Sequence, residues 1–117
     1  MPNILVVDDE AAIRQLVARI LERNGFAVRA CATPHEALAD SQPIDLLLVD
    51  LILPDMNGRT LAEKLRERHP HLPVILMSGY LPQHDLTPSP PSTFLQKPMK
   101  MADVLATVVE MIGPAKA

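Results

Sequence analysis

Five polar residues of this 117-residue sequence stand where short apolar runs end. Asp8 and Asp9 follow the first run, Asp50 ends an uninterrupted later run, and Ser78 and Lys97 follow two more. A continuous apolar run of this length is typical of a strand buried on both faces, as in a parallel sheet. Because the carboxyl ends of parallel strands lie at one edge of the sheet, we expect these five side chains to converge there.

The chemistry of this set is that of a metal-assisted nucleophile. Two like charges about 4 Å apart repel by roughly 4 kcal/mol at an effective dielectric near 20, so three carboxylates need a cation. Oxygen ligands with open water positions suit Mg²⁺, which takes one or two carboxylates and keeps several waters. Beside such a cation, Asp50 could attack phosphorus. The Ser78 hydroxyl and the Lys97 ammonium could then contact two oxygens of the transferred phosphoryl group.

The segments between the apolar runs have helical periodicity. In the first of them, apolar residues recur at intervals of three and four, which predicts a helix with one apolar face that ends at Asn24-Gly25. The stripe on that face consists of Ile13, Leu16, Val17, Ile20 and Leu21. Helices are predicted over residues 11–23, 34–39, 58–68 and 101–112. Strands are predicted over residues 3–7, 26–31, 46–50, 74–77 and 93–96.

Strand and helix therefore alternate along the chain. Such alternation implies an α/β fold with a doubly wound parallel sheet, right-handed crossovers and helices on both faces, and we predict a single domain over residues 1–117. The exception lies between the last two strands. The prolines of residues 80–92 disfavour a full helix there, so we expect a loop or one helical turn.

Length and composition exclude several classes of protein. A chain of this length with 48% hydrophobic and 21% charged residues can fold as one globular domain with a real core. A net charge of −3 gives no reason to expect direct nucleic-acid binding. No apolar run reaches membrane-spanning length, and the single cysteine, Cys31, fits a reducing compartment, so we expect a cytoplasmic protein. We interpret the four histidines, which lack metal-ligand spacing, as surface residues: His35, His69, His71 and His84.

Four motifs together resemble the response-regulator receiver domain of two-component signalling, and the resemblance covers essentially the whole chain. They are VVDDE at residues 6–10, VD at 49–50 with LPDMNG at 53–58, MSG at 77–79 and FLQKP at 94–98. The resemblance implies a CheY-like or flavodoxin-like three-layer sandwich with the strand order 2-1-3-4-5. The chain departs from the family in one region. Receiver domains usually have a full fourth helix before the fifth strand, and here we predict that this helix is short or replaced by a proline-rich loop.

The resemblance implies roles for the acidic residues. Asp50 would accept a phosphoryl group from the phosphohistidine of a histidine kinase or a histidine phosphotransfer protein. Asp9, Asp50 and the backbone carbonyl of Ile52 would bind Mg²⁺, and Asp8 would do so through a water molecule. Asp55, by contrast, is interpreted as a turn residue.

Other residues would read out the modification. Ser78 would be the switch hydroxyl, Phe94 the switch aromatic, and the Lys97–Pro98 peptide bond would be cis. Phosphorylation would shift a two-state equilibrium and so control a downstream protein target. No output segment is recognisable after Ile112, so the chain would act by protein contact or belong to a larger protein, such as a hybrid histidine kinase.

Alternatives from other classes remain. A metal-dependent phosphohydrolase of similar fold usually needs a second acid two residues after the nucleophile, and Ile52 stands there. A nucleotide- or flavin-binding fold needs a glycine-rich loop after the first strand, where Asp8 and Asp9 stand instead. A receiver used only for docking would not need the intact acid set. We expect no separate enzyme activity beyond self-phosphorylation and a slow dephosphorylation, since Ile52 offers no polar group to an attacking water.

Overall fold

The computed structural model describes residues 2–79 and 92–115, in which strands and helices alternate up to β4. The elements are β1 (Asn3–Val7), α1 (Ala11–Arg23), β2 (Ala27–Cys31), α2 (Pro34–Ala39), β3 (Leu46–Asp50), α3 (Gly58–Arg66), β4 (Val74–Ser78), β5 (Ser92–Gln96) and α4 (Met101–Ile112). The predicted bounds differ from these by no more than two residues. The largest difference is at the end of α3, where the amides of Glu67 and Arg68 bond to carbonyls three residues back and the helix tightens into a turn.

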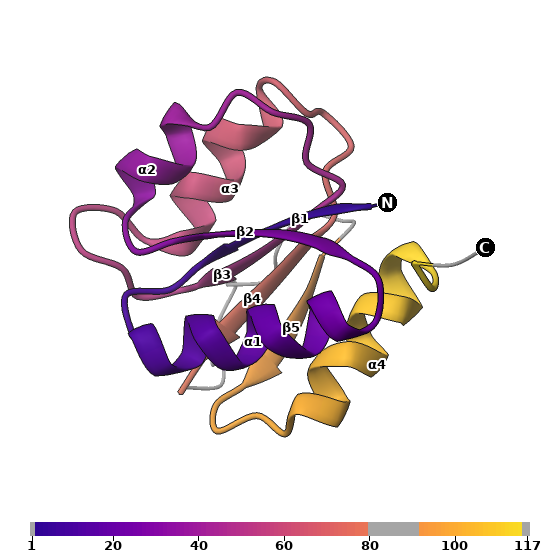
Figure 1. Cartoon of the computed structure of the whole chain (residues 1–117). Coiled ribbons are helices and arrows are strands. Elements are labelled where there is room, and N and C mark those ends of the chain that lie inside the picture. Colours follow the sequence, from indigo (N-terminus) through magenta and orange to yellow (C-terminus); the bar gives the residue numbers. More distant parts are fainter. Residues whose placement is uncertain (1, 80–91, 116–117) are drawn as a thin grey trace.

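The five strands form one parallel sheet in the order β2-β1-β3-β4-β5 (Figure 1). The predicted doubly wound fold and its strand order are therefore confirmed. In the central pair, Val7 of β1 lies beside Val49 of β3. One residue further along, this register places Asp8 beside Asp50, so the two acids meet because their strands are in register.

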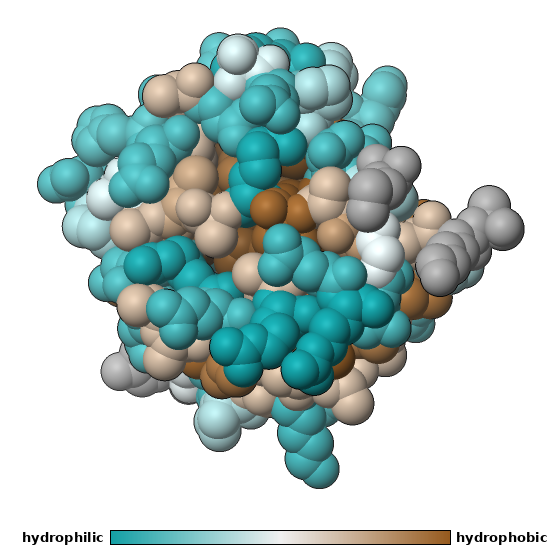
Figure 2. All heavy atoms as spheres, in the orientation of Figure 1, coloured by the Kyte–Doolittle hydropathy of each residue, from teal (hydrophilic) through white to brown (hydrophobic). Residues whose placement is uncertain are grey.

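Two helical layers cover the two faces of the sheet, with α2 and α3 on one side and α1 and α4 on the other (Figure 1). Because side chains alternate along a strand, Val49 packs with Leu61 of α3 while Leu48 packs with Val17 of α1. Both cores consist mainly of buried aliphatic side chains. Figure 2 shows hydrophilic side chains over the outer surfaces of both layers and apolar atoms between them.

The apolar stripe of α1 is narrower than predicted. Val17 and Leu21 are fully buried, but the Leu16 side chain is 46% exposed. A helix lying on a sheet buries only the sector that faces the strands, and Leu16 falls outside that sector although its spacing fits the stripe. Among the described residues, only Leu16 and Ile52 are large exposed apolar side chains.

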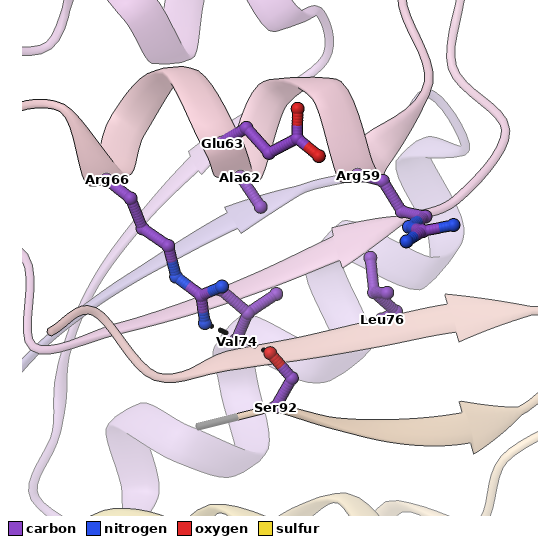
Figure 3. Close-up of a pocket in the computed structure, with 7 residues that line it drawn as sticks. All are labelled: Arg59, Ala62, Glu63, Arg66, Val74, Leu76 and Ser92. Carbon is purple, nitrogen blue, oxygen red and sulfur yellow. Dashed lines mark hydrogen bonds between the residues drawn. The ribbon is translucent and has the colours of Figure 1, made fainter. Parts of the chain in front are cut away.

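One side-chain cap and one arginine fix the position of α3. The Asn57 side chain accepts a hydrogen bond from the amide of Thr60, so it caps the amino end of the helix. Near the other end, Arg66 donates to the carbonyl of Leu72. Its guanidinium also donates to the Ser92 hydroxyl (Figure 3). These contacts tie α3 to the start of β5. The small pocket drawn in Figure 3 contains none of the acids at the carboxyl ends of the strands.

Several sequence predictions concern residues at the surface or outside the described ranges. The loop or single turn predicted within residues 80–92 falls largely on residues 80–91, which lie outside them, as does His84. His35 and His71 are exposed, whereas His69 is half-buried in the turn after α3. Cys31 is buried in the core beside α2 and α3. No helix in the described ranges combines the length and apolarity needed to cross a membrane.

Candidate functional site

Three carboxylates meet at the carboxyl ends of β1 and β3. Carboxylate oxygens of Asp8, Asp9 and Asp50 all lie within 4.8 Å of one another. Asp8 is fully buried and Asp50 is 7% exposed, whereas Asp9 is exposed. Two of the three acids therefore lose their hydration, and their charges need compensation from the protein or from a cation.

Lys97 supplies a positive charge at this cluster. Its ammonium donates to Asp8 Oδ2 and to Asp50 Oδ2, each at 2.8 Å, and lies 3.6 Å from Glu10 Oε1. Its backbone amide donates to the carbonyl of Ser78, which extends the pairing of β5 with β4 beyond the strand ends. The peptide bond between Lys97 and Pro98 is cis. Lys97 stands at a strand end like the acids, and the structure places it in direct contact with two of them.

Burial and ion pairing shift the protonation equilibria of this group. Burial raises the pKa of the Asp8 carboxyl, and the hydrogen bonds from Lys97 and from the Glu10 amide oppose that shift only in part. Burial acts to lower the pKa of the Lys97 ammonium, but its hydrogen bonds to Asp50 and Asp8 outweigh burial, so the net pKa is raised. Lys97 is therefore charged at neutral pH, beside the buried acids.

Backbone amides orient the two buried carboxylates. The Ile52 amide donates to Asp50 Oδ1 at 3.0 Å, and the Glu10 amide donates to Asp8 Oδ1 at 2.9 Å. Each carboxylate thus has one oxygen on a backbone amide and the other on Lys97. The Ile52 side chain is 59% exposed.

Gly58 holds the amino end of α3 against the backbone of Asp50. A β-carbon at position 58 would lie 2.4 Å from the carbonyl oxygen of Asp50, which no real contact permits. The Gly58 amide also donates to the carbonyl of Leu51 at 2.8 Å. The helix can approach the strand end this closely only because residue 58 has no side chain.

Ser78 and Phe94 lie on the strands beyond β3. Ser78 ends β4 and is 1% exposed, and its neighbour Met77 pairs with Asp50 in the sheet. Phe94 pairs with Leu76, is partly buried, and packs against the core beside α2 and α3. The hydroxyl thus belongs to the same edge of the sheet as the acids, whereas the switch roles of both residues stay predictions.

Asp55 does not belong to the acid cluster. It adopts a positive φ of 68° in the loop between β3 and α3, and its exposed carboxylate lies 3.8 Å from His35 Nε2. Asp and Asn tolerate this backbone conformation better than most residues do, as expected of a turn residue.

Three residues near the site were not singled out in the sequence. They are Arg14, which donates to the carbonyl of Asp8, Glu10, which lies near Lys97, and Gly58. The spacing of Arg14 in its helix gave no sign of this contact. The VVDDE and LPDMNG motifs did contain Glu10 and Gly58, but spacing alone cannot reveal their contacts.

The chemistry of the donor set fits a hard divalent cation. All donors are oxygens, they come from three carboxylates, and the exposed side of Asp9 leaves room for water. Asp8, Asp9 and Asp50 could thus hold a metal ion, in the position where the sequence predicts Mg²⁺.

Comparison with known proteins gives consistent results. The family model "Response regulator receiver domain" matches residues 4–109. The sensor kinase CckA of Brucella abortus (strain 2308) is 33% identical over 117 residues, which cover 94% of this chain and 12% of that protein. The solved receiver domain of the hybrid histidine kinase CckA has a TM-score of 0.82 and 34% identity, covering 94% of this chain and 98% of that one.

A second solved structure is a CheY-like response regulator receiver domain protein from Methanospirillum hungatei JF-1. It has a TM-score of 0.83 and 31% identity, and the match covers 96% of this chain and 94% of that one. The chain spans only 12% to 48% of the length of the first curated relatives that it matches. The family match over residues 4–109 and the near-complete coverage of receiver structures mean that this protein belongs to the response regulator receiver domains of two-component systems.

Proposed function

We propose that Asp50 is the phosphoacceptor of this receiver. The observation that carries the proposal is the fixed orientation of its carboxylate, with Oδ1 on the Ile52 amide and Oδ2 on the Lys97 ammonium. Asp50 is also the last residue of a strand that is buried along its whole length. A nucleophile held in one orientation at the mouth of the site loses less entropy when it attacks.

The transfer takes place between a phosphohistidine of the donor protein and the Asp50 carboxylate. A carboxylate oxygen forms a bond to phosphorus, and the bond from phosphorus to the imidazole nitrogen breaks, so that the nitrogen keeps the electron pair. Lys97 is near enough to follow the new acyl phosphate, because it already contacts Asp50 at 2.8 Å. Its ammonium would neutralise one phosphoryl oxygen and the Ser78 hydroxyl would donate to another.

Asp9, Asp50 and the Ile52 carbonyl would hold Mg²⁺, and Asp8 would bind it through water. When bound, this cation neutralises charge on the phosphoryl oxygens and on the acids. The protein's own contribution is to orient the Asp8 and Asp50 carboxylates through Lys97 and two backbone amides.

Ser78 and Phe94 would carry the signal away from Asp50. The phosphoryl group would engage the Ser78 hydroxyl, and Phe94 would then turn further into the core against which it already packs. The resulting change would alter contacts with a downstream protein. We propose no catalysis on a separate substrate, only self-phosphorylation and slow dephosphorylation.

The donor would be a histidine kinase or a histidine phosphotransfer protein, in the cytoplasm. The likeness to CckA favours one specific context, namely a receiver module within a hybrid histidine kinase. A receiver that acts as a separate protein is the other context, and the two differ in whether the donor histidine lies in the same chain.

Incubation with a small phosphoryl donor such as phosphoramidate tests the acceptor. With Mg²⁺ present, intact mass spectrometry should show a single phosphoryl adduct on the wild-type protein and on Asp55→Asn, but none on Asp50→Asn. Asp55→Asn is a matched control because it removes an exposed acid of the same loop that does not belong to the acid cluster.

An adduct on Asp50→Asn, or one lost in Asp55→Asn, would contradict the assignment. Chelation of divalent cations should also prevent adduct formation on the wild-type protein. Formation at an undiminished rate after chelation would count against the role of Mg²⁺.

A further inference from the structure

The three carboxylates of the site are not held equally. Asp8 and Asp50 each bond to a backbone amide and to Lys97. For the exposed carboxylate of Asp9, no hydrogen bond or ion pair is found within the described parts of the chain. The direction of the Asp9 side chain is therefore set by its backbone, and first of all by the peptide that joins it to Asp8.

Arg14 holds that peptide. From the second turn of α1, its guanidinium Nη1 donates to the carbonyl oxygen of Asp8 at 2.8 Å. The Arg14 amide meanwhile bonds to the carbonyl of Glu10, so the backbone beneath the side chain is part of the regular helix. On the other side, the Asp8 amide donates to the carbonyl of Cys31 at the end of β2. The backbone of Asp8 is thus fixed at both of its polar groups.

We propose that Arg14 is a positioning residue for the divalent-cation site. By holding the Asp8 carbonyl it orients the peptide between the two acids, and so directs the Asp9 carboxylate toward Asp8 and Asp50. This inference rests on the proposed function, since it concerns the same cation. Arg14 touches neither the nucleophile nor the phosphoryl group, and it acts only through the backbone of the acidic loop.

The direction of the change in Mg²⁺ affinity on replacing Arg14 distinguishes a positioning role from an effect of its charge. Arg14 carries a positive charge close to three acids, and loss of that charge alone would strengthen the binding of a cation. Loss of the hydrogen bond would free the peptide and weaken Mg²⁺ binding. Removal of groups that hydrogen-bond to metal ligands commonly lowers metal affinity by about 10-fold or more. Positioning and charge therefore predict opposite changes in Mg²⁺ affinity.

The experiment is a titration of the purified protein with Mg²⁺, followed by backbone amide chemical shifts of the residues around the site. Arg14→Met should need about 10-fold more Mg²⁺ for half-saturation than the wild type. Arg19→Met is the matched control, because it removes the same charge from an exposed position of the same helix. It should bind Mg²⁺ as tightly as the wild type or slightly more tightly. The melting temperature without Mg²⁺ verifies that each variant is folded.

Unchanged or tighter Mg²⁺ binding by folded Arg14→Met would overturn the inference. If that variant does not fold, Arg14→Lys replaces it, because it keeps the charge but loses the planar fork of donors. Arg14→Lys should then bind Mg²⁺ more weakly at the same net charge, and equal affinity would overturn the inference. Failure of the proposed function would look different, since the wild-type protein itself would show no Mg²⁺-dependent shifts.

Discussion

At the scale of single residues, Lys97 contributes most to charge compensation in the acid site. Its ammonium is the partner of two buried carboxylates, and its own side chain is only 14% exposed. A lysine in this position takes the place that a bound cation would otherwise have to fill. The same charge would therefore compete with a divalent cation for the oxygens of Asp8 and Asp50.

Replacement of Lys97 by methionine should destabilise the protein without Mg²⁺. Two buried acids would lose their partner, which costs about 3 kcal/mol in the free energy of unfolding. Addition of Mg²⁺ should restore more stability to Lys97→Met than it adds to the wild type, because the cation no longer competes with an ammonium. Urea unfolding with and without Mg²⁺ measures both effects. Lys64→Met, an exposed lysine of α3, is the control, and an equal loss in the two variants would contradict the prediction.

Also at the scale of single residues, Ile52 should set how fast the phosphoryl adduct on Asp50 decays. Its amide holds Asp50, but its side chain is apolar and 59% exposed beside the acceptor. Ile52→Asn should speed the decay of the phosphoryl adduct severalfold, because an amide can orient a water molecule that isoleucine cannot. The decay is followed by intact mass after removal of the donor. Leu16→Asn, which changes another large exposed apolar side chain, should leave the decay unchanged. An unchanged rate in Ile52→Asn would refute the idea.

At the scale of elements, the contact between α3 and the end of β3 sets the position of the acceptor. The cap from Asn57 starts the helix, and Gly58 then lies directly against the backbone of Asp50. Any side chain at position 58 must push the helix away or move the strand end.

Gly58→Ala should therefore lower both stability and phosphorylation. Overpacking of this kind costs about 2 kcal/mol, and displacement of Asp50 should slow adduct formation with phosphoramidate. Gly79→Ala is the matched control for stability, because a β-carbon there would meet nothing within 4 Å. Thermal unfolding and adduct formation are measured on the same samples. Wild-type stability in Gly58→Ala would show that the helix can move without cost.

At the scale of the whole molecule, acid groups outside the site contribute to stability in a pH-dependent way. Arg29 of β2 donates to both carboxylate oxygens of Asp40, the residue that follows α2. Burial acts to raise the pKa of Asp40, but the hydrogen bonds from Arg29 and from the Gln42 amide outweigh it, so the net pKa is lowered. This contribution to stability is complete above the ordinary pKa near 3.8 and is lost as the pH falls through the lowered value.

Asp40→Asn should therefore cost about 1 kcal/mol near neutral pH and much less in strong acid. The pKa of Asp8 is raised, so its contribution to stability changes with pH in the opposite direction. The informative quantity is therefore the difference in the free energy of unfolding between wild type and variant at each pH. Urea unfolding from neutral pH to below pH 4 provides it. The exposed Glu22→Gln should show no such trend. A difference between wild type and Asp40→Asn that stays constant over the whole range would contradict the pKa shift.

The sequence was sufficient for most of the fold because its signals are periodic. Alternating apolar runs and helical stripes predicted every described element to within two residues, and the rule of parallel strands brought Asp8, Asp50 and Lys97 to one edge. The spacing of apolar residues was misleading at Leu16, because spacing along one helix does not show how that helix packs on the sheet. Leu16 has the spacing of a core residue, but it falls outside the sector of α1 that faces the strands, and its side chain is 46% exposed.

By itself, the sequence determined which residue types stand at the strand ends, and thus which chemistry the site could have. Only the tertiary structure decided how the groups pair, because contacts depend on distances between atoms that lie far apart in the chain. Lys97 bridges two acids 89 and 47 positions away, Gly58 lies against Asp50, and Arg14 reaches back to the Asp8 carbonyl. None of these contacts has a periodic signature, since each arises where separate elements pack together.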